Sequence, residues 1–335
     1  MRAALACTCS LIASFALAQN ASPSLHELAA LKAKPRENAL VAIRGTHDGE
    51  AALLALETEA ALAADARRQD GKPPLFRGCL RADEFELAAQ LALARAAANG
   101  KAYRLLAAEY RRLSTLLRTT LAAAQSSGDW RLRFTHLGHW IDDWERATRP
   151  AVRELLHRTL VDQAIRASLS SYEGARLYGK TRPTAALRTY DEYIFNLMCT
   201  ADEDNINWLR SQVANNGWFD ISRYGRVADQ AAWLMVQHAD GDPNYQAYVA
   251  SLLETKVKSG DTDPQNFASL SDRIAVRAGL PQRFATQMEC VDGEWIAPHI
   301  EEPADLNARR AAMGLPSYQE QVAQRRHLTC RKTPH

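Results

Sequence analysis

The sequence predicts an all-α protein of two packed helical domains, with at most one short β-hairpin near residues 290–298. Two observations favour helices: apolar residues recur every three or four positions along most of the chain, and strong helix formers end at glycine or proline. A third observation limits the amount of sheet. A good strand pattern is missing outside "CVDGEWIAPHI", where Asp292-Gly293 would form the turn.

The N-terminal domain is expected over residues 19–175. Its first helix begins with a capping box formed by Ser24 and Glu27. The segments "EAALLALETEAALAADARRQ" and "ADEFELAAQLALARAAANG" are rich in helix formers and stop at glycine, and "AYRLLAAEYRRLSTLLRTTLAAAQ" continues the helical spacing. Two further helices are expected over residues 130–148 and 150–170.

A boundary between the domains is expected near residues 172–186. The segment there, "YEGARLYGKTRPTAA", contains glycines, a proline and several polar residues. The C-terminal domain would cover residues 186–327, with shorter and more aromatic helices. Within it, Asp242 and Pro243 are typical of a helix start, because aspartate accepts backbone N–H bonds and proline fits the first turn.

The composition is that of an ordinary globular protein: 335 residues, 47% hydrophobic, 24% charged, with a formal net charge of +2. A nucleic-acid-binding protein would usually show a concentrated basic face. The arginines between Arg104 and Arg188 are instead interrupted by acidic residues and alanines. No nucleic-acid partner is therefore expected.

The first residues, "MRAALACTCSLIASFALAQ", are typical of a signal peptide over residues 1–18. An apolar run follows Arg2, and Ala16 and Ala18 form a small-residue cleavage site. The run is too short to span a membrane, and no later segment is apolar enough to do so. We therefore expect a soluble protein without membrane insertion, located in the periplasm or secreted.

Export changes the interpretation of the cysteines that remain after cleavage, which are Cys79, Cys199, Cys290 and Cys330. An even number of cysteines in an oxidising compartment favours two disulfides over free thiols. The sequence allows three ways of pairing them. Pairing Cys79 with Cys199 and Cys290 with Cys330 is preferred, because each bond then closes a loop within its own half of the chain.

Five blocks follow one another between residues 191 and 324: "DEDNINWL", "GWFDISRYG", "AAWLMVQHADGDPNYQ", "SLSDRIAVRAGLPQRFATQ" and "DLNARRAAMGL". In order and spacing they resemble an uncharacterised bacterial family, domain-of-unknown-function family 6624. The family pattern has Tyr-Gly where this chain has Phe284-Ala285, and it often has an arginine where this chain has Phe195. The resemblance implies no known activity and leaves the N-terminal domain unaccounted for.

A first polar group lies in "HLGHWIDDWE". A helix would place His136, His139 and Asp143 on one face, and two histidines with a carboxylate could bind zinc. Trp140 and Trp144 form their own pair beside them, a pattern more typical of packing. We therefore expect no metal and no cofactor.

A second group surrounds His238. Ala231, Leu234 and His238 recur at three- and four-residue spacing, so the histidine continues a buried stripe at the end of its helix. Gln237 lies on an adjacent face. Both ring nitrogens of a buried histidine need hydrogen-bond partners. Either a structural neighbour or a functional site would supply them.

A third group lies in "SDRIAVRAGLPQRFATQ". Asp272 falls on a small-residue face that suggests close packing, where a carboxylate needs partners. Further polar side chains on this segment are Arg273, Gln282, Thr286 and Gln287. They form either a hydrogen-bond network that fixes how the helices cross or one site together with His238.

The motifs of serine hydrolases, phosphate-binding loops, HExxH proteases and EF-hands are missing, which leaves acid–base chemistry. We predict an exported protein whose C-terminal domain has a polar pocket for a small polar ligand or peptide. The predicted ligand-binding residues are Gln237, Arg273, Gln282, Thr286 and Gln287. The alternative is an envelope hydrolase or lyase in which His238 and Asp272 are catalytic.

Overall fold

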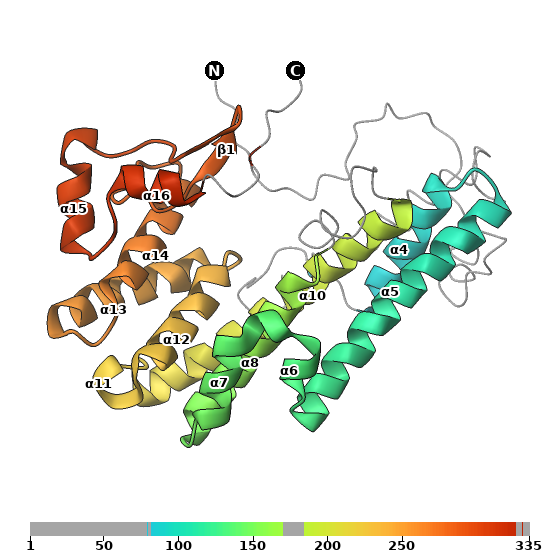
Figure 1. Ribbon diagram of the computed structural model, residues 1–335, viewed down its shortest axis with the longest axis horizontal. Coiled ribbons are helices and arrows are strands. Elements are labelled where there is room, and N and C mark those ends of the chain that lie inside the picture. The colour runs from blue at the N-terminus through green and yellow to red at the C-terminus, as the bar shows by residue number, and fades with distance from the viewer. Residues whose placement is uncertain (1–78, 80–81, 170–183, 326–329, 331–335) are drawn as a thin grey trace.

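The computed structural model describes residues 79, 82–169, 184–325 and 330. These residues form a helical protein with one short two-stranded antiparallel sheet, which confirms the predicted fold class (Figure 1). The predicted signal peptide and the capping box of Ser24 and Glu27 lie outside the described residues. Within the described ranges, no helix has the length and apolar character needed to cross a membrane.

The first described elements include two long helices, α5 (Gly100–Ser127) and α8 (Pro150–Ala167), with shorter helical turns between them. The others are α4 (Ala82–Ala96), α6 (Trp130–Arg133), the 3-10 turn η1 (Thr135–Leu137) and α7 (Gly138–Arg146).

Helix α5 illustrates how local sequence sets these elements. The Asn99 side chain accepts a hydrogen bond from the backbone N–H of Ala102 and caps the helix start. The helix ends at Gly128, whose φ of 70° lies in the left-handed region that favours glycine. Tyr103 and Tyr110 lie on the buried face, spaced as an amphipathic helix requires.

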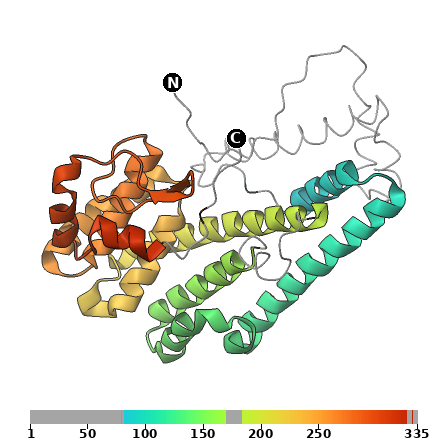
Figure 2. The same cartoon turned by 45° about the horizontal axis from the view of Figure 1, so that its top comes forward.

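Helix α10 (Ala185–Asn216) connects the two ends of the protein. It contacts α4 and α5 as well as α8 and α12 (Arg226–His238) (Figure 2). One cluster of buried apolar side chains extends from Phe85 in α4 to Leu270 in α14 (Pro264–Arg277). Most of the expected boundary segment lies outside the described residues, so the division into two domains stays a prediction.

The expectation of shorter helices after residue 186 is wrong for α10, which has 32 residues and is longer than α5 with 28; the elements that follow α10 are shorter. Besides α12 and α14 they are α11 (Ile221–Tyr224), α13 (Pro243–Ser259), β1 (Glu289–Val291), β2 (Glu294–Ile296), the 3-10 turn η2 (Pro303–Asp305), α15 (Leu306–Ala312) and α16 (Tyr318–Arg325). Two local predictions are confirmed here. Asp242 caps α13 by accepting a 3.0 Å hydrogen bond from the N–H of Tyr245, and β1 pairs with β2 around Asp292 and Gly293.

Both predicted disulfides are confirmed. Cys79 is bonded to Cys199 in α10, and Cys290 in β1 is bonded to Cys330. The first bond links Cys79, the first described residue, to α10. The second links the hairpin to Cys330, the last described residue. Such crosslinks stabilise a fold mainly by restricting the unfolded chain.

Candidate functional site

The predicted residue Asp272 lies in α14 and is fully buried. Its carboxylate accepts hydrogen bonds from the backbone N–H groups of Arg283, Phe284 and Thr286 at 2.8–3.0 Å. It also accepts a 2.9 Å bond from the Thr286 hydroxyl. Four donors from one loop satisfy the carboxylate, so Asp272 fixes the backbone of that loop.

The same loop is held from its other side by Arg310, which is also fully buried. Its guanidinium donates to the carbonyl oxygens of Phe284 and Ala285 and to that of Pro316. Ala285 has a φ of 54°, a left-handed conformation that favours glycine. The loop is therefore clamped between a buried acid and a buried base.

Gln282 and Gln287 belong to this clamp as well. The Gln282 side chain donates to the carbonyl oxygens of Gln287 and Pro298 and accepts from the N–H of Gln287. The Gln287 amide donates to the carbonyl oxygen of Ser269. The structure thus brings Asp272, Gln282, Thr286 and Gln287 together as a hydrogen-bond network, one of the two alternatives that the sequence left open.

The other predicted residues lie elsewhere. Arg273 donates two hydrogen bonds to Asp240, and Gln237 is buried in α12. Among the described residues, no hydrogen bond or ion pair joins His238 to Asp272. The catalytic pairing of His238 with Asp272 stays a prediction without a contact to support it.

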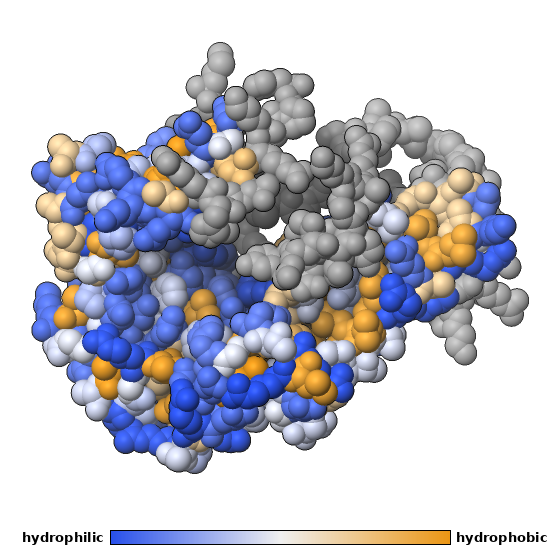
Figure 3. Space-filling view, viewed as in Figure 1, coloured by the Kyte–Doolittle hydropathy of each residue, from blue (hydrophilic) through white to orange (hydrophobic). Residues whose placement is uncertain are grey.

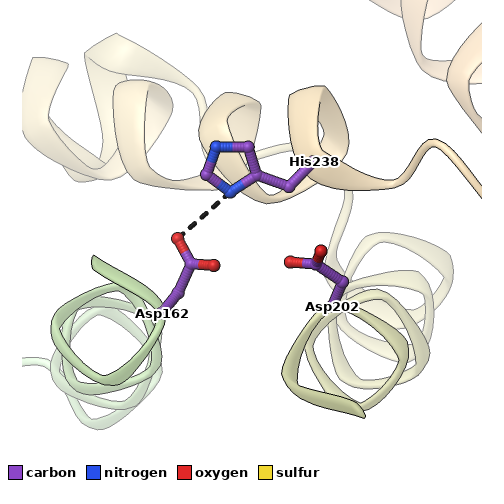
Figure 4. Close-up of side chains that lie close together, drawn as sticks. All are labelled: Asp162, Asp202 and His238. Carbon is purple, nitrogen blue, oxygen red and sulfur yellow. Dashed lines mark ion pairs between the residues drawn. The ribbon is translucent and has the colours of Figure 1, made fainter. Parts of the chain in front are cut away.

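His238 instead faces two aspartates from other helices, Asp162 in α8 and Asp202 in α10. Its Nδ1 atom lies 3.1 Å from Oδ2 of Asp162, an ion-pair distance. Figure 4 shows Nδ1 directed toward the gap between the two carboxylates, while the second ring nitrogen points away from both. The Nδ1 atom is buried and, apart from this ion pair, has no hydrogen-bond partner of ordinary geometry.

Arg166, one helical turn after Asp162, bridges the two aspartates. Its Nε donates to Oδ1 of Asp162 at 2.8 Å, and its Nη2 donates to Oδ1 of Asp202 at 2.5 Å. Gln163 donates a 2.8 Å bond to Oδ2 of Asp162. One oxygen of each carboxylate is thus fixed by the same guanidinium.

The two carboxylates differ in how readily they ionise. Burial raises the pKa of Asp202 to about 7, and the negative charge of Asp162 adds to this rise against the opposing effect of Arg166. Burial also disfavours ionisation of Asp162, but the charges of His238 and Arg166 outweigh it and lower its pKa. The pair shares its negative charge unequally, as expected for two buried carboxylates in contact.

The donor atoms are arranged so that a cation could lie among them. One ligand atom each from Asp162, Asp202 and His238 lies within 4.8 Å of the other two. Ligands 2.0–2.2 Å from a tetrahedral zinc ion are about 3.4 Å apart. The side chains would need to approach one another by no more than about 1.4 Å.

The first polar group of the sequence forms no such cluster. Asp143 pairs with Arg146 one turn away, and the rings of His136 and His139 pack against Phe134 and Trp140. These contacts are those of packing and of an ordinary surface ion pair.

Sequence reasoning missed Asp162, Arg166 and Asp202. A signal was present, because Leu155, Thr159 and Asp162 recur at four- and three-residue spacing on the buried face of α8. A carboxylate on such a stripe needs partners, as we argued for Asp272. Its partners come from α10 and α12, and one sequence without a contact map does not indicate which residues those are.

The surface near the C-terminal elements has a hydrophilic hollow (Figure 3). On the face seen in Figure 3, the surface is hollowed beside these elements, and the visible part of the hollow is mostly hydrophilic. A hydrophilic hollow suits a polar ligand better than an apolar one.

Comparison with known proteins gives one match. The sequence profile of a family of unknown function, DUF6624, matches residues 150–328. The match begins at the first residue of α8 and includes Asp162, Arg166, Asp202 and His238. Neither the curated proteins nor the solved structures contain a significant match.

Proposed function

The chain belongs to the family of unknown function DUF6624, and we propose that it is an exported helical protein that binds a small polar ligand or peptide through a divalent cation. The cation would be held by Asp162, Asp202 and His238. The observation that carries the proposal is the buried Nδ1 of His238, which is directed between two buried carboxylates without an ordinary hydrogen bond.

Two other buried aspartates show how this protein satisfies a carboxylate for structural reasons. Asp229 accepts bonds from the Trp218 indole, the Thr262 hydroxyl, the Asn266 amide and the Asp263 N–H. Asp272 likewise has four uncharged donors. In both cases neutral hydrogen-bond donors stabilise one isolated carboxylate.

The arrangement around Asp162 and Asp202 is different. Two carboxylates approach one another in the interior, where like charges repel strongly, and the pKa of Asp202 is raised although Arg166 donates to both. A divalent cation would supply the missing positive charge. The nearby imidazole nitrogen would then be a metal ligand rather than an ion-pair partner of Asp162 alone.

The ligand set indicates which cation to test. Imidazole suits zinc and other transition metals, and carboxylates suit manganese and zinc. Three protein ligands leave open coordination positions, as in catalytic and ligand-binding sites, whereas structural zinc sites are closed by four. This proposal departs from the expectation of no metal that we drew from the sequence.

Export is supported by the cysteines. Both disulfides are compatible with an oxidising compartment outside the cytosol. Intact-mass measurement of protein from the envelope fraction tests the proposed processing, with cleavage expected after Ala18. A chain that keeps Met1 would contradict it.

The metal proposal is tested by titrating chelator-treated protein with Zn²⁺ and with Mn²⁺ in a calorimeter. We expect binding that weakens more than about tenfold in His238→Ala and in Asp202→Asn. Asp143→Asn is the matched control, because it makes the same change in an ion pair outside the cluster. Unchanged binding in both cluster variants would contradict the proposal.

One observation favours the alternative of an acid–base hydrolase or lyase. Nδ1 of His238 lies beside Asp162 while the second ring nitrogen faces away from both carboxylates (Figure 4). A carboxylate that orients an imidazole in this way leaves the second nitrogen for proton transfer. Such an enzyme would keep its activity after chelation and would bind neither Zn²⁺ nor Mn²⁺ at this cluster.

A further inference from the structure

Arg166 has a part of its guanidinium that the two aspartates do not use. Nε and Nη2 donate to Asp162 and Asp202, while Nη1 donates to no residue in the described part of the chain. The Arg166 side chain keeps 22% of its surface exposed. A donor therefore remains beside the proposed cation position.

The exposure of the cluster indicates the side from which a ligand would approach. Asp162 is 4% exposed, whereas the side chains of Asp202 and His238 are 11% and 15% exposed. The accessible edge is thus formed by Asp202, His238 and Arg166. Side chains that are this little exposed leave room for only one small group of a ligand.

The charges indicate the chemistry of that group. Arg166 and a divalent cation together carry more positive charge than the two carboxylates carry negative charge, so the loaded site is cationic. An anionic oxygen is a preferred partner both for an open metal position and for an arginine N–H. A neutral or cationic group would leave this excess charge uncompensated.

We infer that the loaded site takes an anionic oxygen group, a carboxylate or a phosphate, which binds the cation and accepts a hydrogen bond from Nη1 of Arg166. The inference rests on the proposed function and names the class of its polar ligand. Arg166 is then a specificity-determining residue as well as the residue that positions the two aspartates.

The test uses purified protein loaded with Mn²⁺ and two probes, inorganic phosphate and acetate. We expect each probe to change the electron paramagnetic resonance spectrum of the bound Mn²⁺ and to bind only in its presence. Arg166→Lys keeps the positive charge but loses the guanidinium geometry. In this variant the affinity for the better probe should fall about tenfold or more, as for loss of one charge-assisted hydrogen bond.

Arg153→Lys is the matched control, because it makes the same change at an exposed position of the same helix. Binding of Mn²⁺ without any spectral response to phosphate or acetate would overturn this inference and leave the cation site standing. An equal probe affinity in Arg166→Lys and in Arg153→Lys would overturn the role of Arg166. Failure of the unmodified protein to bind Mn²⁺ or Zn²⁺ would overturn the proposed function and this inference with it.

Discussion

Replacing Arg166 with glutamine should make the stability of the folded protein depend on a divalent cation. The guanidinium is the only positively charged group that donates hydrogen bonds to both Asp162 and Asp202 among the described residues. Glutamine is uncharged and too short to bridge them. The variant therefore leaves two buried carboxylates with no fixed positive charge between them.

The expected loss follows from the burial of these groups. Removing one partner of a buried ion pair destabilises a protein by about 3–5 kcal/mol. The unfolding entropy is about 2.1 cal/mol/K per residue, or about 0.7 kcal/mol/K for a chain of 335 residues. Each 1 kcal/mol therefore shifts Tm by about 1.4 °C, and Tm should fall by about 4–7 °C. A cation present at a hundred times its Kd would restore about 2.7 kcal/mol.

The assay is a thermal melt of Arg166→Gln and of the unmodified protein, each with chelator and with Zn²⁺ or Mn²⁺. The Tm increase caused by the cation should be larger in the variant, because both carboxylate charges are then available to the metal. Arg166→Gln combined with Asp202→Asn is the control, since it removes one negative charge and should recover stability without metal. A variant as stable as the unmodified protein in chelator, or one that gains no more from the cation than that protein does, would refute the reasoning.

Three further predictions concern the structural parts of the protein. Asp272→Asn should lower the free energy of unfolding by about 1–3 kcal/mol, because an amide cannot accept from all four loop donors. Binding of Mn²⁺ should stay unchanged in calorimetry. A variant that keeps its full stability but loses Mn²⁺ binding would contradict the structural role of Asp272. Ala285→Gly should stabilise the protein by up to about 1 kcal/mol in chemical unfolding, since glycine removes the backbone strain of the left-handed φ of 54°. A clear destabilisation would show that packing of the Ala285 Cβ atom outweighs that strain. Reduction should lower Tm, because each disulfide typically contributes about 2–4 kcal/mol; coincident melting curves with and without reductant would contradict this.

The fold could be predicted because its signals are local. Asp242 followed by proline indicated the start of α13, and Asp292-Gly293 indicated the turn of the hairpin. Both depend on backbone preferences of a few adjacent residues. The disulfide pairing was also predictable, since a preference for the shorter loops selects one of the three connectivities.

The site could be predicted only in part, because its residues come from three helices. His238 stood out as a polar residue that continues a buried stripe, but its partners lie in α8 and α10. Asp272 stood out for the same reason, although its partners lie in the loop that follows its own helix. Burial of a polar residue can thus be inferred from periodicity, whereas the choice between a local and a distant partner depends on tertiary packing.

The family match and the packing together indicate what the N-terminal helices do. All four residues of the candidate site lie within residues 150–328, whereas α4 and α5 lie before the match. These helices pack on the first half of α10, where the ring of Tyr193 contacts Phe85 and Tyr110 at centroid distances of 5.7 and 6.4 Å.

The bond from Cys79 to Cys199 joins α10 one turn before Asp202. A helix as long as α10 stays in place only if its apolar face is covered along its length. The N-terminal helices therefore hold the element that positions Asp202 and contribute no residue to the cluster itself. Relatives that lack α4 and α5 should accordingly have polar residues at the position of Tyr193 while keeping an aspartate at the position of Asp202.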